Sequence, residues 1–126
     1  MKKSLPQILS TLTYLPDRKP EMAFTGGAEA AFAEVAPIRD GAIFVGHYSG
    51  NSEWERHAAG DEFVMVLEGS TTVVLRIDSR DERASLVQQE LVVVPAGVWH
   101  RFENSQNLKV LTVTPQPTEH RLALDA

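Results

Sequence analysis

The sequence predicts an all-β protein, an antiparallel sandwich or barrel, preceded by a short, partly helical segment. From Gly41 onward it contains about eight short segments rich in β-branched and aromatic residues, bounded by Gly, Pro, Asn, Asp or Ser. No long helical pattern interrupts them, and strands at such short, even spacing are typical of sandwiches and barrels. The fully polar stretch 78–83 lies between two apolar segments and predicts a hairpin turn.

Ahead of these strands, composition and boundary signals predict two helices, at 6–12 and in the Ala-rich stretch 27–38. A segment rich in proline and charge separates them. We therefore divide the chain into an N-terminal arm at 1–40, a β-domain at 41–118 and a C-terminal tail at 119–126. The strands are expected at 41–48, 52–57, 62–69, 71–78, 84–89, 90–95, 100–104 and 109–115.

Length, charge and cysteine content limit the function classes. With 126 residues, the chain is long enough for one hydrophobic core and too short for two ordinary domains. A formal net charge of −5 argues against a nucleic-acid partner, because phosphate binding needs a basic face. The absence of cysteine excludes disulfides, thiolate ligands and a cysteine nucleophile. We see no signal peptide and no apolar run of roughly 18 residues, so we expect a soluble, cytoplasmic protein without a membrane partner.

Ligand-type side chains gather in the stretch 54–63, WERHAAGDEF. Successive side chains of a strand point to opposite faces. One face therefore carries Glu53, Glu55 and His57, and the other carries Trp54 and Arg56. Gly60 can then take a positive φ in a turn, and Glu62 begins the next strand. Along 62–67 the even-numbered residues share one face and the odd-numbered residues share the other. If Glu62 also faces inward, three ligand-type side chains meet at one end of a barrel.

A fourth ligand has to come from elsewhere in the chain, and His100 is the candidate that spacing favours. Pro95 ends one strand, Gly97 allows a tight turn, and the chain re-enters a strand at His100. In two ordered motifs the chain resembles the cupin superfamily: His57 with Glu62 and Gly69, then Pro95 with Gly97, His100 and Asn104. The resemblance covers residues from about 41 to 115.

This resemblance implies a small double-stranded β-barrel of the jelly-roll type, with a metal ion held in the barrel mouth. Carried over to this chain, it makes His57, Glu62 and His100 ligands of a divalent transition metal, either Zn, Fe, Ni or Mn. The family usually has a histidine at the position of Glu55 and a glycine at that of Gln89. Strand parity nevertheless turns Glu55 towards the same site, so we count it as the fourth ligand.

The glutamate at position 55 changes the charge of the expected site. Three histidines and one carboxylate around a divalent ion leave a net positive charge, whereas the set Glu55, His57, Glu62 and His100 leaves the site neutral. A neutral site is a weaker Lewis acid and attracts an anionic ligand less. If only one carboxylate binds, two histidines and one carboxylate remain, an arrangement associated with open-sided non-haem Fe(II). The second carboxylate is then a candidate general base.

The expected function is that of a metal-dependent enzyme, of the dioxygenase or isomerase type, acting on a small polar or carbonyl-containing molecule. Two alternatives stay open. The chain can be a non-catalytic sensor or binding module that uses the metal to hold a small ligand, or the barrel can be structural and the ion adventitious. Turnover under different metal loadings distinguishes the first hypothesis from the other two.

Residues near the expected site have simpler interpretations. His47 either projects into the barrel or is an ordinary strand-end histidine, and the second interpretation is favoured. His120 is expected to be solvated in the tail. Phe102 shares the inward face of His100 and is expected to line the pocket. Residues expected outside the site are Asp61 as a turn former, Trp99 and Arg101 beside His100, and Asn104 in the turn after the strand.

Open β-barrels have edge strands that need cover, and packing across a dimer is one common remedy. Residues 1–22 are a candidate arm for laying over a neighbouring subunit. We therefore expect a homodimer.

Overall fold

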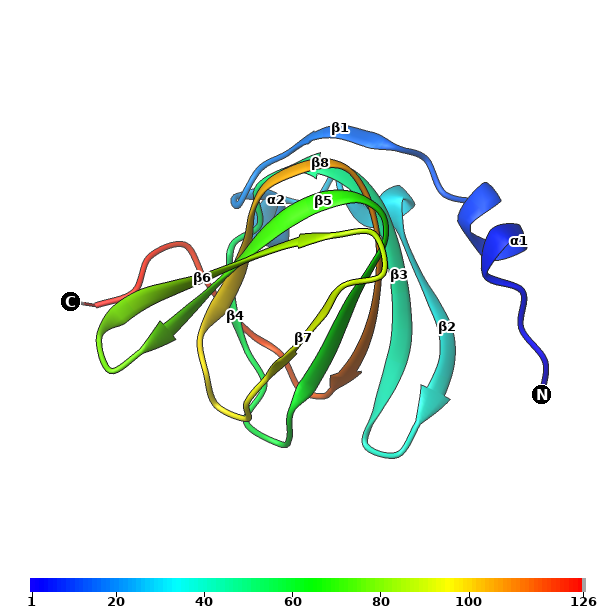
Figure 1. Cartoon of the computed structure of the whole chain (residues 1–126). Coiled ribbons are helices and arrows are strands. Elements are labelled where there is room, and N and C mark those ends of the chain that lie inside the picture. Colours follow the sequence, from blue (N-terminus) through cyan, green and yellow to red (C-terminus); the bar gives the residue numbers. More distant parts are fainter. Residues whose placement is uncertain (126) are drawn as a thin grey trace.

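The computed structural model describes residues 1–125 and confirms an all-β fold. Its nine strands wind into an open barrel whose hydrogen-bonded path does not close into a ring (Figure 1). The strands are β1 (Leu15–Arg18), β2 (Phe32–Ile38), β3 (Gly41–Gly50), β4 (Trp54–Arg56), β5 (Glu62–Ile77), β6 (Arg80–Val87), β7 (Leu91–Val94), β8 (His100–Pro115) and β9 (Glu119–Arg121). The helices are α1 (Leu5–Ser10), α2 (Met22–Thr25) and a 3-10 helix at Glu29–Ala31. None of the helices within residues 1–125 is long and apolar enough to span a membrane.

The two longest strands, β5 and β8, bend so that each contributes to both ends of the barrel. β5 begins beside β7 and continues beside β6, while β8 pairs with both of its halves. Where the sequence predicted two strands in each segment, the structure has one continuous, bent strand. At Gly69 φ is +78°, and a Cβ atom would lie 2.3 Å from the Asn107 carbonyl oxygen, so this bend requires glycine.

The hairpin predicted at 78–83 is confirmed, and its turn is tighter than the polar stretch suggested. Asp78 and Ser79 form the turn between β5 and β6, and both have positive φ. This combination matches the right-handed twist of the two strands. The polar residues that follow already belong to β6.

The helix predicted at 27–38 is wrong for most of its length. Phe32–Ile38 forms β2, which pairs antiparallel with β3. Alanine favours a helix in isolation, but pairing with β3 satisfies the backbone and buries Val35, and such tertiary pairing overrides a weak propensity. Pro37 suits an edge strand better than a helix interior. The helix predicted at 6–12 is present as α1.

Both terminal segments pair with the barrel. β1 runs parallel to the end of β3 and crosses one end of the barrel (Figure 1). At Gly50, where φ is +106°, a Cβ atom would lie 2.4 Å from the Arg18 carbonyl oxygen, so glycine permits this close approach. Near the other terminus, β9 pairs with β4. Residues from outside 41–118 therefore lie next to the expected site.

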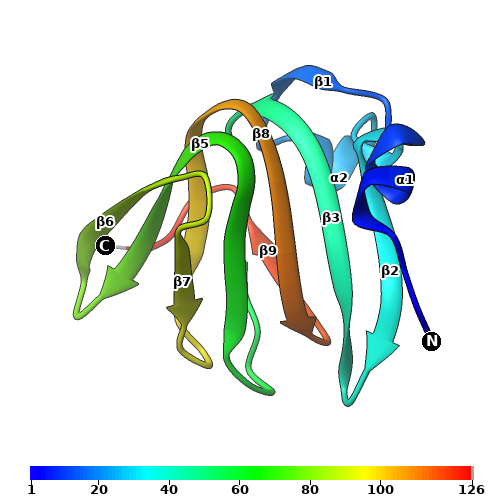
Figure 2. The ribbon, with the colours of Figure 1, turned by 45° about the vertical axis from the view of Figure 1, so that its right-hand side comes forward.

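One wall of the barrel consists of β7, β5, β8, β3 and β2, which lie side by side in Figure 2. At the start of β5, side chains point alternately to the inner and the outer face, as predicted for 62–67. Glu62, Val64 and Val66 are buried, whereas the alternate residues are partly exposed on the outer face. The buried apolar side chains that form the core include Tyr48, Val64, Val66, Val73, Leu86, Val94, Phe102, Leu108 and Val110.

Candidate metal centre

Along 53–56, strand parity turns Glu53 and Glu55 inward and Trp54 and Arg56 outward, as predicted. Trp54 packs against Arg76 and Arg101, whose guanidinium carbons lie 5.1 and 4.5 Å from its indole ring. Arg56 stacks over Trp99, at 4.7 Å. Trp99 and Arg101 therefore contact the outer side of β4, and their predicted orientation away from the site is confirmed.

The loop 57–61 connects β4 to β5 and is tied to the turn before β8. Asp61 Oδ1 accepts a hydrogen bond of 2.9 Å from the Ala96 N–H, and the His57 carbonyl accepts one of 3.0 Å from the Gly97 N–H. These bonds join two segments that are far apart in sequence and hold both motifs at one end of the barrel. The prediction that Asp61 shapes this loop is confirmed.

Four side chains meet at that end, Glu55, His57, Glu62 and His100, and one ligand atom of each lies within 4.8 Å of the others. His100 Nε2 is 2.9 Å from Glu62 Oε1. His57 Nε2 is 3.4 Å from Glu62 Oε2 and 3.8 Å from Glu55 Oε2. The side chain of Glu55 is 18% exposed, and the other three side chains are almost fully buried. The structure therefore brings together all four residues that the sequence predicted as ligands.

The tautomer of His57 follows from its surroundings. Its Nδ1 lies 3.0 Å from Thr118 Oγ1, and that hydroxyl donates to Gln116 Oε1 at 3.2 Å. The hydroxyl oxygen therefore accepts the proton of Nδ1, and Nε2 of the neutral ring carries a lone pair. His57 Nε2 is buried and has no hydrogen-bond partner within the described residues. A buried acceptor without a partner is costly unless a cation or proton meets it.

His100 repeats this arrangement. Its Nδ1 donates to the Val98 carbonyl at 3.0 Å, which leaves Nε2 directed at Glu62. Two acceptors that face each other at 2.9 Å need a positive species between them. Without a metal this is a proton: burial lowers the pKa of His100, but the hydrogen bond and charge of Glu62 outweigh it, so the pKa is raised.

The two carboxylates of the cluster differ in ionisation. Burial disfavours the charge of Glu62, but the hydrogen bond and the charge of His100, with His57 close by, outweigh it and lower its pKa to about 2. Burial, and then the charges of Glu53 and Glu62, raise the pKa of Glu55 to about 8. At neutral pH the metal-free cluster therefore holds one ionised carboxylate and one protonated carboxyl, and a metal ion has to displace that proton.

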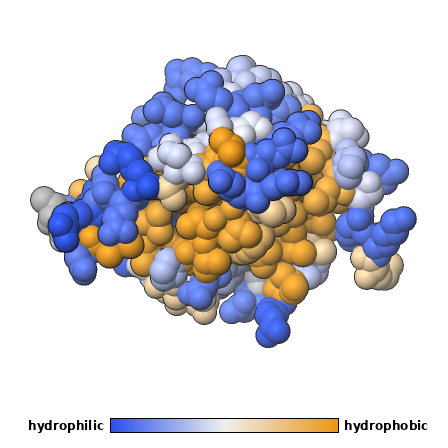
Figure 3. Space-filling view, viewed as in Figure 1, coloured by the Kyte–Doolittle hydropathy of each residue, from blue (hydrophilic) through white to orange (hydrophobic). Residues whose placement is uncertain are grey.

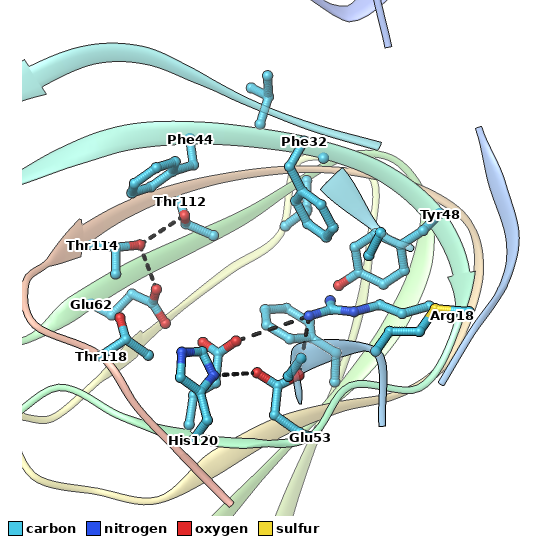
Figure 4. A pocket seen from close by; sticks show the side chains of 18 of the residues that line it. Arg18, Phe32, Phe44, Tyr48, Glu53, Glu62, Thr112, Thr114, Thr118 and His120 are labelled. Carbon is cyan, nitrogen blue, oxygen red and sulfur yellow. Dashed lines mark hydrogen bonds and ion pairs between the residues drawn. The ribbon is translucent and has the colours of Figure 1, made fainter. Parts of the chain in front are cut away.

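Two threonines of β8 orient Glu62 from the other side. Thr114 Oγ1 donates to Glu62 Oε2 at 2.6 Å, and Thr112 Oγ1 lies 2.9 Å from Thr114 Oγ1 (Figure 4). Their spacing of two residues places both on the inner face of the strand. Hydrogen bonds of this kind fix the orientation of a ligating carboxylate.

A cavity of about 570 Å³ lies beside the cluster and is lined by Glu55 and Glu62. Its volume falls within the range of roughly 300–1,000 Å³ typical of small-molecule sites. The polar lining includes Thr112, Thr114, Thr118, Arg18, Glu53 and His120, and the aromatic lining consists of Phe32, Phe44, Tyr48 and Phe102. The cavity can therefore take a small molecule that is mostly apolar and carries a few polar groups.

A family model described as "Cupin domain" matches residues 45–114, more than half of the chain, and this range contains all four clustered side chains. The chain belongs to the cupin family.

Solved structures support the same fold. A cupin-2 domain protein from Shewanella frigidimarina is 26% identical, with a TM-score of 0.56 over 71% of this chain and 79% of its own. A hydroquinone 1,2-dioxygenase from Sphingomonas sp. TTNP3, solved with 4-hydroxybenzoate bound, is 21% identical, with a TM-score of 0.58 over 73% of this chain and 67% of its own. Among curated proteins, an uncharacterized protein of Acanthamoeba polyphaga mimivirus is 31% identical over 71 residues, a match that covers 54% of this chain. The match spans 43% of that relative's length.

Three ionisable residues of the cavity had no assigned role at the sequence level: Arg18, Glu53 and His120. Glu53 accepts from His120 Nδ1 at 2.6 Å and, on its other oxygen, from Arg18 Nη2 at 3.4 Å (Figure 4). The sequence placed His120 in a solvated tail; its ring keeps 39% exposure, yet it lines the cavity and binds Glu53. Parity marked Glu53 as inward-facing, but no local pattern indicated its partners.

The structure also decides between the two interpretations of His47. Its Nε2 lies 2.8 Å from Asn107 Oδ1, and its ring packs against Tyr14, outside the cavity. It is therefore an ordinary strand histidine, which is the interpretation that the sequence favoured. Phe102 is buried and lines the cavity, which confirms its prediction.

Proposed function

We propose that Glu55, His57, Glu62 and His100 hold one divalent transition-metal ion and that this cupin is a metal-dependent enzyme. The observation that carries the proposal is the buried His57 Nε2, which lacks a hydrogen-bond partner within residues 1–125 and lies 3.4 Å from an ionised carboxylate. A cation at this position satisfies the nitrogen lone pair and the carboxylate together.

The chemistry of the donors supports the same proposal. Two imidazole nitrogens and two carboxylate oxygens suit Zn, Fe, Ni or Mn. With both carboxylates ionised, a divalent ion and its four ligands carry no net charge. When bound, such an ion supplies a Lewis acid for an oxygen of the ligand. The cavity provides the place for that ligand, because two of the four side chains line it.

The reactions that we propose to test first are dioxygenation and isomerisation of small polar or carbonyl-containing molecules. The dioxygenase of the same fold acts, by its name, on hydroquinone, which supports beginning with phenols. Oxygen uptake and product formation are measured on protein loaded with Fe(II), Mn(II), Ni(II) or Zn(II). If small molecules bind but no loading gives turnover, the alternative of a non-catalytic binding or sensor module replaces the enzyme proposal.

Metal content tests the site independently of turnover. We expect about one transition-metal ion per chain in the wild type and almost none in the double variant His57→Ala, His100→Ala, measured by elemental analysis. The variant His47→Ala is the matched control, because His47 lies outside the cavity, and it should keep its metal. Equal metal content in wild type and double variant would exclude the site.

We also propose that this cupin forms a homodimer through the outer face of the wall β7-β5-β8-β3-β2. Apolar side chains are neighbours across four strands in the row Val93, Phe63, Val113 and Ile43, and Leu91, Met65 and Leu111 form a second row. Val93 and Leu91 are 51% and 49% exposed. Figure 3 shows hydrophobic surface gathered in the middle of this face. Contiguous apolar surface usually marks an interface, and a twofold axis lets two copies of one face cover each other.

The dimer is tested by a charge placed in the first row. We expect a dimeric mass for the wild type in light scattering at micromolar concentration and a monomeric mass for Val93→Glu, because burying an uncompensated carboxylate is costly. Thr72→Glu, on the other half of β5, is the control and should stay dimeric. A monomeric wild type would refute the proposal.

A further inference from the structure

We propose that Arg18 is an acid-binding residue of the cavity, which holds the carboxylate of a small, largely apolar ligand next to the metal position. The inference rests on the proposed function, because the proposed metal position defines where the ligand lies in the cavity. Arg18 lies outside the part of the chain that matches the family model. The family model therefore carries no information about this residue.

The position of Arg18 is built by specific contacts. β1 carries it to the end of β3, where only glycine at position 50 permits the approach. Its guanidinium carbon lies 4.6 Å from the centroid of the Tyr48 ring and 5.0 Å from that of Phe32. The side chain is 11% exposed. Stacking on two aromatic rings holds the guanidinium group in one place, so little conformational entropy is lost when a ligand binds.

The guanidinium group keeps hydrogen-bonding capacity towards the cavity. Its contact with Glu53 Oε1 is long, at 3.4 Å, and Glu55 Oε1 is 3.9 Å away, beyond hydrogen-bond distance. The Tyr48 hydroxyl is its other polar neighbour. These contacts use only some of the five N–H donors of an arginine. Figure 4 shows Arg18 directed into the cavity between Tyr48 and Glu53.

Glu53 does not depend on Arg18 alone. Its other oxygen accepts the much shorter bond from His120, at 2.6 Å. A ligand carboxylate can therefore take over donors of Arg18 while Glu53 stays hydrogen-bonded. The planar fork of arginine matches a carboxylate with two parallel bonds, which a neutral carbonyl cannot reproduce.

The rest of the cavity wall defines the chemistry of the ligand. Phe32, Phe44 and Phe102 line it and favour an apolar body, such as a single ring. The ionised glutamates of the lining repel an acid, and Arg18 is the only arginine or lysine among the residues that line this cavity. Recognition of an acid therefore depends on this one side chain. Because Arg18 lies 3.9 Å from Glu55, the bound carboxylate sits beside the metal position.

Benzoate is a suitable probe, with benzamide as its uncharged counterpart. We expect calorimetric titration to show benzoate binding to the wild type and affinity about tenfold to a hundredfold lower for Arg18→Gln, which loses a charged hydrogen bond. Arg18→Lys keeps the charge but not the fork and should bind benzoate with intermediate affinity. Benzamide affinity should change by less than about threefold. Arg76→Gln removes a stacked arginine from the outer surface and is the matched control.

A second variant is expected to raise the benzoate affinity, which distinguishes the proposal from a loss of binding through misfolding. Glu53→Gln removes the competing carboxylate and should tighten benzoate binding, an outcome that damage to the fold cannot produce. Titrations run on metal-free and on Zn(II)-loaded protein separate this inference from the proposed metal function. Benzoate binding that depends on Arg18 in the metal-free protein supports the inference even if no metal binds. Equal benzoate affinity in wild type and Arg18→Gln overturns it even if the metal site is real.

Discussion

The cavity has two sides that differ in origin and in chemistry. One side consists of Glu55, His57, Glu62 and His100, which lie within the residues that match the family model and are mostly buried. The other side includes Arg18 and His120, which come from β1 and β9, outside that match, and face the cavity. The matched part of the barrel therefore supplies metal-type donors, and segments outside the match supply the groups that a ligand meets next to them.

The sides also differ in how their charges are satisfied. On the first side, lone pairs of two histidines are directed at carboxylates, and His57 Nε2 has no hydrogen-bond partner in the described chain. On the second, Arg18, Glu53 and His120 already hydrogen-bond to one another. We infer that the first side needs a cation to be complete, whereas the second is complete and available for recognition. The following changes test that distinction.

The largest effect is expected from Glu62→Gln. Glu62 is the carboxylate that both histidines face, so its loss removes a ligand oxygen and the negative charge that balances the ion. We expect the affinity for Zn(II), measured by competition with a chromophoric chelator, to fall by about a hundredfold or more. Glu68→Gln, an exposed position paired with Lys109, is the control and should bind Zn(II) normally. A Glu62→Gln variant that binds Zn(II) as tightly as the wild type would show that this carboxylate is not a ligand.

The pH dependence of the metal-free protein should depend on Glu55. Its pKa in the fold is about 8, above its ordinary value of 4.5, so the folded state keeps a proton that the unfolded state has lost. The free energy of unfolding should therefore fall by a few kcal/mol as the pH rises from about 4.5 to about 8. Glu62 acts in the opposite sense, because its pKa of about 2 gives a stabilisation that is lost only as the pH falls below 4.5 towards 2.

Urea unfolding at pH 5 and pH 8, after removal of metal by a chelator, measures this effect. Glu55→Gln should be nearly as stable as the wild type at pH 5 and more stable than it at pH 8. A remaining slope is expected from His100, whose raised pKa gives a stabilisation that is also lost as the pH rises. If the two proteins lose the same stability between pH 5 and 8, Glu55 is ionised in the metal-free fold.

The metal side could be predicted from the sequence for two reasons. The alternation of a strand decides that Glu55 and His57 face the same way. The resemblance of two short motifs to the cupin superfamily then implied that Glu62 and His100 join His57, although His100 reaches β4 and β5 only through long-range pairing. The same alternation along 62–67 predicted the inner and outer faces of β5 correctly.

The other side could not be predicted because it depends on pairings between distant segments. Arg18 reaches the cavity only because β1 pairs with β3, and His120 only because β9 pairs with β4. The error at 27–38 has the same cause, since β2 exists as a strand through its pairing with β3. Composition near the termini indicates local propensity, and these contacts override it.

Thr118 lies at the junction of the two sides, and its removal should have a moderate effect. Its hydroxyl accepts the Nδ1 proton of His57 and so fixes both the tautomer and the ring orientation. We expect Thr118→Val to lower Zn(II) affinity about tenfold, as loss of a hydrogen bond to a metal-binding histidine typically does. Thr72→Val, whose hydroxyl lies near Ser85 on the surface, should leave the affinity unchanged. An unchanged affinity in Thr118→Val would mean that the ring is held without this bond.

The smallest effect on metal binding is expected from His120→Gln. Glu53, Glu55 and His120 also lie close enough together to hold a cation, so His120 could in principle belong to the metal side. However, Glu53 already accepts its bonds from His120 and Arg18, and no buried atom of this group lacks a partner among residues 1–125. A glutamine can still donate to Glu53, and we therefore expect Zn(II) affinity within about threefold of the wild type. A loss of tenfold or more would place His120 among the groups that hold the ion, and the two sides of the cavity would then form a single metal site.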